Sequence, residues 1–95
     1  MNVDVEIYLN QFFSFFEKNP NSLIELIGGL DKNIFYNKIK EQCYINLNKG
    51  EDVAITRSQI IEIIGNLFKN QKNETIIEKT NRLFQDTKFG LIYLN

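Results

Sequence analysis

The strongest constraint on the fold is an amphipathic pattern in residues 4–18, where large apolar side chains recur at the three- and four-residue spacing of an α-helix. One side of this segment, at 100° per residue, carries Val5, Tyr8, Leu9, Phe12, Phe13, Phe15 and Phe16. The only proline of the chain, Pro20, follows closely, and a proline disfavours helical geometry in the residue before it. The pattern therefore predicts a helix over residues 4–18, and Asn19 and Pro20 can cap and open a second one.

Four further helices follow from the same periodicity and from residues that favour helix ends. They are expected over residues 20–27, 31–48, 56–69 and 75–84. The first of these could instead begin after Ser22, which has capping-box spacing to Glu25. Asp31 is the expected cap of the third helix. The fourth and fifth begin with capping-box spacing, in which Thr56 or Thr75 is followed three residues later by Gln or Glu. Gly65 lies inside the fourth helix and costs about 1 kcal/mol relative to alanine, so we expect a close approach by a neighbouring helix.

Two apolar runs outside these helices suit extended backbone. Residues 88–95 are too apolar to remain in water, and residues 53–55 are too few to form a helix. The tail could pack on its own helices, where residues 91–93 could pair with residues 53–55 in a short two-stranded ribbon, or it could insert into a second copy or a partner. We expect a single all-α domain over residues 1–95, a bundle of four to five helices with an extended C-terminal segment.

The sequence offers little catalytic or metal chemistry. It contains no histidine and one cysteine, which removes the commonest general base and any zinc site of Cys and His ligands. Cys43 falls on the expected buried stripe of the third helix, so packing explains it better than nucleophilic chemistry. That stripe comprises Phe35, Ile39, Cys43 and Leu47. Glu51 and Asp52 precede a helix, where carboxylates add favourable charge. We expect no enzyme, no cofactor and no metal site.

Nucleic-acid binding is the alternative function. The helices expected over residues 31–48 and 56–69 flank a turn, and the second opens with polar side chains that can touch phosphates and base edges. These side chains are Thr56, Arg57, Ser58 and Gln59. The connection exceeds the three or four residues usual in a helix-turn-helix, and a formal net charge of -1 supplies no basic field. Nucleic acid is therefore the less favoured partner.

Apolar residues away from the core stripes predict a protein interface. The candidates are Ile34, Tyr44 and Ile45 on the third helix and Phe89, Leu91 and Tyr93 in the tail. The first residues are acidic, unlike a signal peptide, and no apolar run reaches the length of a membrane span. We expect a cytoplasmic, non-catalytic accessory, regulatory or assembly protein that binds a protein partner or forms a homo-oligomer, without membrane contact.

Three segments that together cover most of the chain carry a resemblance. They read VDVEIYLNQFFSFFEKNP, KGEDVAITRSQIIEII and TKFGLIYLN. In order and character they resemble small uncharacterised proteins of marine T4-like phages and AT-rich marine bacteria. The abundance of Ile, Asn, Lys and Phe is compatible with an AT-rich genome. The resemblance implies no activity and no functional residues.

Overall fold

The structure, a computed structural model, describes residues 3–94, with side chains over residues 5–92. Within that range the chain forms six α-helices and no β-strand. They are α1 (Val3–Lys18), α2 (Pro20–Ile27), α3 (Lys32–Asn48), α4 (Arg57–Leu67), α5 (Asn73–Gln85) and α6 (Thr87–Leu94). None of these helices has the length and apolar character needed to cross a membrane. The all-α class is confirmed, with more helices than the expected four to five.

Two of the four expected N-caps, Asp31 and Thr56, cap their helices through the side chain. Asn19 lies at the N-cap position of α2 without capping it, and its Nδ2 donates to the Phe15 carbonyl at 2.9 Å. The Asp31 side chain accepts a hydrogen bond from the backbone N–H of Asn33 and caps α3. Thr56 and Gln59 form the complete capping box of α4. The capping box expected at Thr75 is wrong, because α5 begins two residues earlier, after an N-cap lysine that makes no side-chain cap. Thr75 therefore lies within the first turn.

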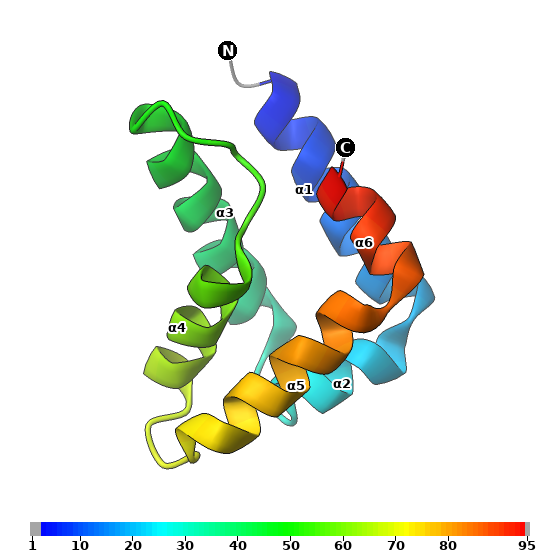
Figure 1. Ribbon diagram of the computed structural model, residues 1–95, viewed down its shortest axis with the longest axis vertical. Coiled ribbons are helices and arrows are strands. Elements are labelled where there is room, and N and C mark those ends of the chain that lie inside the picture. Colours follow the sequence, from blue (N-terminus) through cyan, green and yellow to red (C-terminus); the bar gives the residue numbers. More distant parts are fainter. Residues whose placement is uncertain (1–2, 95) are drawn as a thin grey trace.

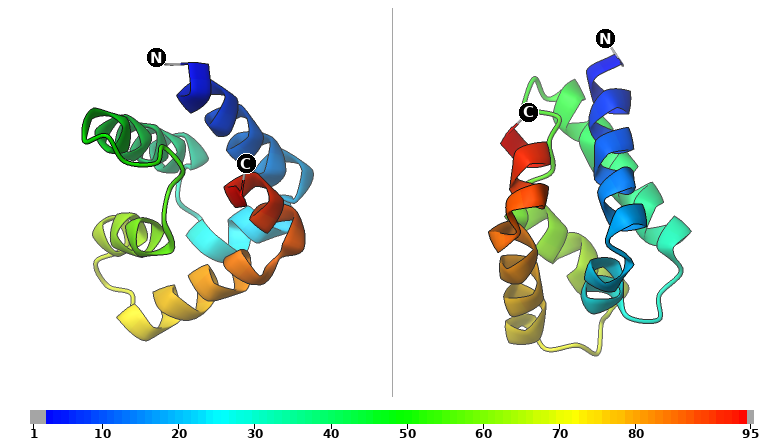
Figure 2. Two further views of the ribbon diagram at one scale, coloured as in Figure 1. Left: turned by 45° about the horizontal axis from the view of Figure 1, so that its top comes forward. Right: turned by 90° about the vertical axis from the view of Figure 1, so that its right-hand side faces the viewer.

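The helices enclose one interior from several sides. α6 runs antiparallel to α1 and beside it, α5 crosses near their base, and α2 lies behind α5 (Figure 1). α3 and α4 form the other side, with α4 also packed against α5. The two turned views show the same enclosure (Figure 2).

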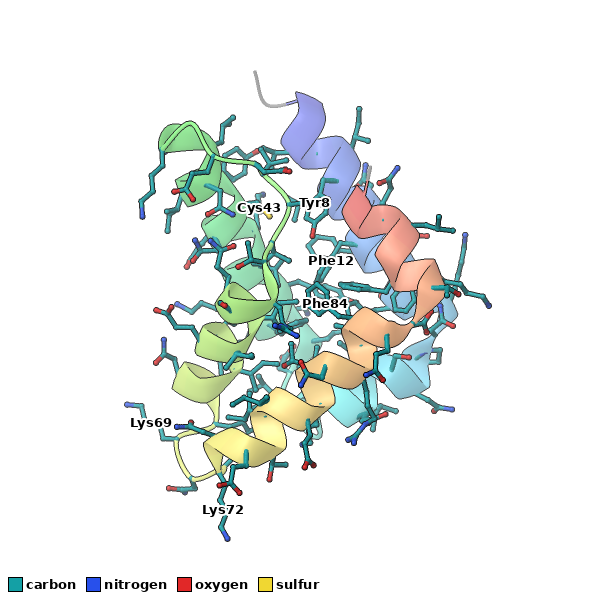
Figure 3. All side chains as sticks on the ribbon, viewed as in Figure 1. Tyr8, Phe12, Cys43, Lys69, Lys72 and Phe84 are labelled. Carbon is teal, nitrogen blue, oxygen red and sulfur yellow. The ribbon has the colours of Figure 1, made fainter. Side chains whose placement is uncertain are left out.

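Five phenylalanine rings from α1, α5 and α6 pack together in the interior beside α1, and we call them the phenylalanine cluster. Its members are Phe12, Phe15 and Phe16 from α1, Phe84 from α5 and Phe89 from α6. The Phe89 ring centroid lies 5.7 Å from Phe12, 5.3 Å from Phe15 and 5.2 Å from Phe84, in edge-to-face geometry. Aromatic pairs favour this arrangement. Figure 3 shows Phe12 and Phe84 pointing toward each other across the interior.

The C-terminal segment differs from the expected extended tail. Residues 87–94 form α6, joined to α5 through Asp86 alone. The N–H of Gly90 bonds to the carbonyl of Asp86 at 2.9 Å, so the segment satisfies its own backbone and has no need of a partner strand. Helical geometry also turns Phe89 and Ile92, three residues apart, toward the core. The extended segment and the two-stranded ribbon were wrong predictions.

Residues 53–55 pack on α1 in place of the expected ribbon. Ile55 is fully buried, and its N–H donates to the hydroxyl of Tyr8 at 3.1 Å. In Figure 3 Tyr8 points from α1 toward this connection. The expectation for Gly65 is also wrong, because a Cβ added there would meet no atom within 4 Å.

Candidate protein-binding surfaces

The side chains considered for chemistry are occupied by structural roles. Cys43 is fully buried on α3, and burial raises the pKa of its thiol to about 12. Because the thiolate is the reactive form, this thiol is inert at neutral pH. Asp52 accepts a hydrogen bond from the N–H of Ala54 at 3.0 Å and shapes its own loop. Among the described residues no cluster of acidic and cysteine side chains could hold a metal ion.

Three of the four candidate nucleic-acid contacts are engaged within the chain. Thr56 and Gln59 cap α4, as described above. Arg57 Nη1 donates to Asn81 Oδ1 of α5 at 3.1 Å. The side chain of Ser58 is exposed. The start of α4 is therefore tied to α3 and α5.

A buried amide pair joins α3 to α4 and was missed in the sequence. Asn46, 2% exposed, accepts from Gln59 Nε2 at 2.9 Å and donates to Gln59 Oε1 at 3.0 Å. Gln42 Nε2 donates to the same Asn46 oxygen at 3.0 Å. Asn46 continues the stripe that begins at Phe35, so its position could have been found by periodicity. We call Gln42, Asn46 and Gln59 the amide joint.

The candidate interface residues on α3 do not form one patch. Ile34 and Ile45 are 45% and 44% exposed, but they lie three turns apart, about 16 Å along the helix axis. The Tyr44 ring is half-buried against the core. Tyr44 and Ile45 border a shallow hollow of about 540 Å³, together with Asn37, Lys40 and Glu41. Its lining carries both charge signs and comes from a single helix.

The candidate interface residues in the tail fall into three situations. Phe89 is fully buried in the phenylalanine cluster, so it is not available to a partner and its assignment to the interface was wrong. Leu91 is 65% exposed on the opposite side of α6. The side chain of Tyr93 lies outside the described residues. The tail thus completes the core of its own chain and leaves Leu91 at the surface.

Leu91 stands beside a groove between α1 and α6. We call this groove of about 340 Å³ the α1–α6 groove. It is lined by Gln11, Ser14, Phe15, Lys18 and Asn19 on one side and by Lys88, Leu91 and Ile92 on the other. Phe15 is 5% exposed and Ile92 is half-buried, so the groove has an apolar floor and an exposed apolar wall.

The charge in the α1–α6 groove has one sign. Lys18 and Lys88 are its charged lining residues, and neither has an ion-pair partner among the described side chains. The nearest acidic residue in sequence, Glu17, is directed to α3, where it accepts from Lys32 Nζ at 3.3 Å and from the Tyr36 hydroxyl at 3.4 Å. The groove is therefore locally positive on a chain whose formal net charge is -1.

A second hollow, between α2 and α5, carries charges of both signs. It measures about 180 Å³, and Glu25 and Arg82 form an ion pair within its lining. Lys79 and Asp86 line the same hollow, so both charge signs are present. Its charges are compensated by the chain itself, unlike those of the α1–α6 groove.

No protein-family model matches this chain, and no curated protein or solved structure matches it.

Proposed function

We propose that the protein is a non-catalytic accessory, regulatory or assembly factor that acts by binding another protein chain in the α1–α6 groove. The observation that carries the proposal is Leu91, which is 65% exposed at the wall of a groove floored by Phe15 and Ile92. Removing a leucine side chain from water contributes roughly 1.5–3 kcal/mol. An apolar partner residue packed beside Leu91 would also be removed from water, so both side chains would contribute to the binding free energy.

The shape of the groove favours a helical segment. Two neighbouring helices present a channel, and an amphipathic helix binds such a channel with anchors at three- and four-residue spacing. α6 spans eight residues, about 12 Å, so the groove accommodates about two turns of a partner helix. The α3 hollow is less suitable, because one convex helix supplies its entire lining.

The experiment is selection of peptides from a random displayed library on the immobilised protein, followed by fluorescence polarisation with each enriched peptide. Leu91→Asp should lower affinity at least about tenfold, because a carboxylate replaces the apolar wall. Ile24→Asp is the matched control, since Ile24 is 61% exposed on α2, away from the groove lining. Its affinity should equal that of the wild type.

Two results would reject the proposal. One is the recovery of no peptide whose binding depends on Leu91. The other is an equal loss of binding in Leu91→Asp and Ile24→Asp, which would indicate a general effect of added charge. Circular dichroism should show both variants folded, as expected for substitutions at exposed positions.

A further inference from the structure

We infer that the segment bound in the α1–α6 groove is an acidic amphipathic helix, whose carboxylates face Lys18 and Lys88 while its apolar side chains rest on Leu91 and Ile92. This inference rests on the proposed function and specifies the chemistry of the partner. Its first support is charge complementarity, because the groove lining contains two lysines and no carboxylate. Opposite charges across an interface orient the partner and exclude segments of the wrong sign.

The position of Lys88 is a second and independent support. This lysine lies in the first turn of α6, where the helix dipole places partial positive charge and a cation is disfavoured. The Asp86 carboxylate accepts a hydrogen bond from the backbone N–H of Lys88 at 2.8 Å. No described carboxylate forms an ion pair with the Lys88 ammonium group. A carboxylate supplied by a partner would give this ammonium group an ion pair that no described side chain gives it.

The same geometry argues against nucleic acid as the occupant. Single-stranded nucleic acid binds by stacking bases on exposed aromatic rings along a basic path. The one aromatic ring in the groove lining, Phe15, is 5% exposed and engaged with Phe16 and Phe89. Two lysines beside an apolar wall suit carboxylates spaced along an amphipathic helix better than a continuous phosphate backbone.

The test uses the peptides selected on the wild-type chain and a double charge reversal, Lys18→Glu with Lys88→Glu. Enriched sequences should combine Asp or Glu with apolar residues at three- and four-residue spacing. The double variant should lose at least about tenfold in affinity, and raising salt from about 50 to about 500 mM should weaken wild-type binding. Peptides with Lys in place of Glu should recover binding to the double variant.

The variant should stay folded, because both lysines are exposed and the helix-dipole effects oppose each other: glutamate is favourable in the first turn of α6 and unfavourable, by about 0.3–1 kcal/mol, in the last turn of α1. Thermal unfolding followed by circular dichroism checks this. The matched control reverses Lys69 and Lys72, which point outward from the turn between α4 and α5 (Figure 3). That control should bind the selected peptides as the wild type does.

Several outcomes would overturn the inference. Peptides that depend on Leu91 but carry no acidic excess would leave the proposed function standing and reject the acidic partner. Equal losses of peptide affinity in the Lys18/Lys88 variant and in the Lys69/Lys72 control would show that the effect depends on net charge and not on the groove. Binding of single-stranded DNA that requires Lys18 and Lys88 would assign the groove to nucleic acid. If the wild type is a dimer in sedimentation equilibrium and the Lys18→Glu/Lys88→Glu variant is a monomer, the groove would be assigned to a second copy of the chain.

Discussion

The phenylalanine cluster and the amide joint hold helices together by different physical means. The cluster joins α1, α5 and α6 through aromatic rings at 5–6 Å, and most of its attraction comes from the apolar area that the rings bury. The amide joint links α3 to α4 through hydrogen bonds at 2.9–3.0 Å between Asn46 and Gln59. We therefore expect the cluster to contribute more stability than the amide joint, whereas the hydrogen bonds of the joint fix how α3 and α4 sit relative to each other.

The largest effect should come from Phe89→Ala, which removes the ring that joins α6 to the cluster. Truncating a buried phenylalanine costs about 3–5 kcal/mol, and α6 should become mobile. Urea unfolding and hydrogen exchange measure the two effects. Leu91→Ala on the same helix is the control and should change the free energy of unfolding by no more than about 0.5 kcal/mol. Equal costs for the two variants would contradict the docking of α6 on its own chain.

The next largest effect should be a loss of stability at alkaline pH. It arises from two titratable side chains of α3, whereas the amides of the amide joint do not titrate. Burial raises the pKa of Cys43 from 9.0 to about 12; burial and then Glu17 raise the pKa of Tyr36 from 10.0 to about 12. Since both folded pKa values exceed the unfolded ones, stability is complete below pH 9 and falls as pH rises toward 12.

Urea midpoints between pH 8 and 11.5 measure this loss. Cys43→Ala combined with Tyr36→Phe removes both titrations and retains the stacked ring of residue 36, which lies 4.2 Å from Phe13. The double variant should lose less stability across this window than the wild type. Parallel losses in the two proteins would mean that other groups govern alkaline unfolding.

Asn46→Ala should have an intermediate effect, because it removes the buried member of the amide joint and leaves the half-buried Gln59 amide with only its hydrogen bond from the Thr56 N–H. An unpaired buried polar group costs about 1–3 kcal/mol. A double-mutant cycle with Gln59→Ala should give a coupling energy of about 0.5–3 kcal/mol. Asn48→Ala, exposed on the same helix, is the control. Additive losses from Asn46→Ala and Gln59→Ala would show that the two amides do not act as a joint.

Gly65→Ala should have the smallest effect and the opposite sign. An added Cβ meets nothing within 4 Å, so alanine should stabilise α4 by about 0.5–1 kcal/mol without disturbing the amide joint. Gly50→Ala is the matched control, since its φ of 73° suits glycine and the same substitution should destabilise. Thermal unfolding distinguishes the two; destabilisation by Gly65→Ala would reveal a packing constraint at α4.

The longer helices could be predicted from the sequence because each carries several turns of apolar periodicity and clear end signals. Residues 4–18 and the Thr56 capping box are examples. α6 could not be predicted in this way, because two turns of mostly apolar residues give no contrast between a buried and an exposed face. Its helical form depends on the site that Phe89 fills, which α1 and α5 create only in the folded chain.

The candidate site was predicted only in part. Leu91 was among the expected interface residues, and the structure gives it a groove; Phe89 was grouped with it, although the helix turns the two side chains to different sides. Lys18 and Lys88 were missed because residues distant in sequence meet across α1 and α6. Asn46 was missed because an asparagine is usually exposed, despite its place on the buried stripe of α3. The resemblance to phage and marine bacterial proteins stays a prediction.

The contribution of α6 to the phenylalanine cluster also bears on how the chain is made. A ribosome delivers Phe12, Phe15 and Phe16 before the other rings of the cluster, and Phe89 is the last of the five to emerge. Until then the other rings lack their cover, and exposed apolar surface of this kind attracts chaperones and promotes aggregation. A nascent chain truncated before α6 should therefore be far more prone to aggregation than its helical content alone suggests.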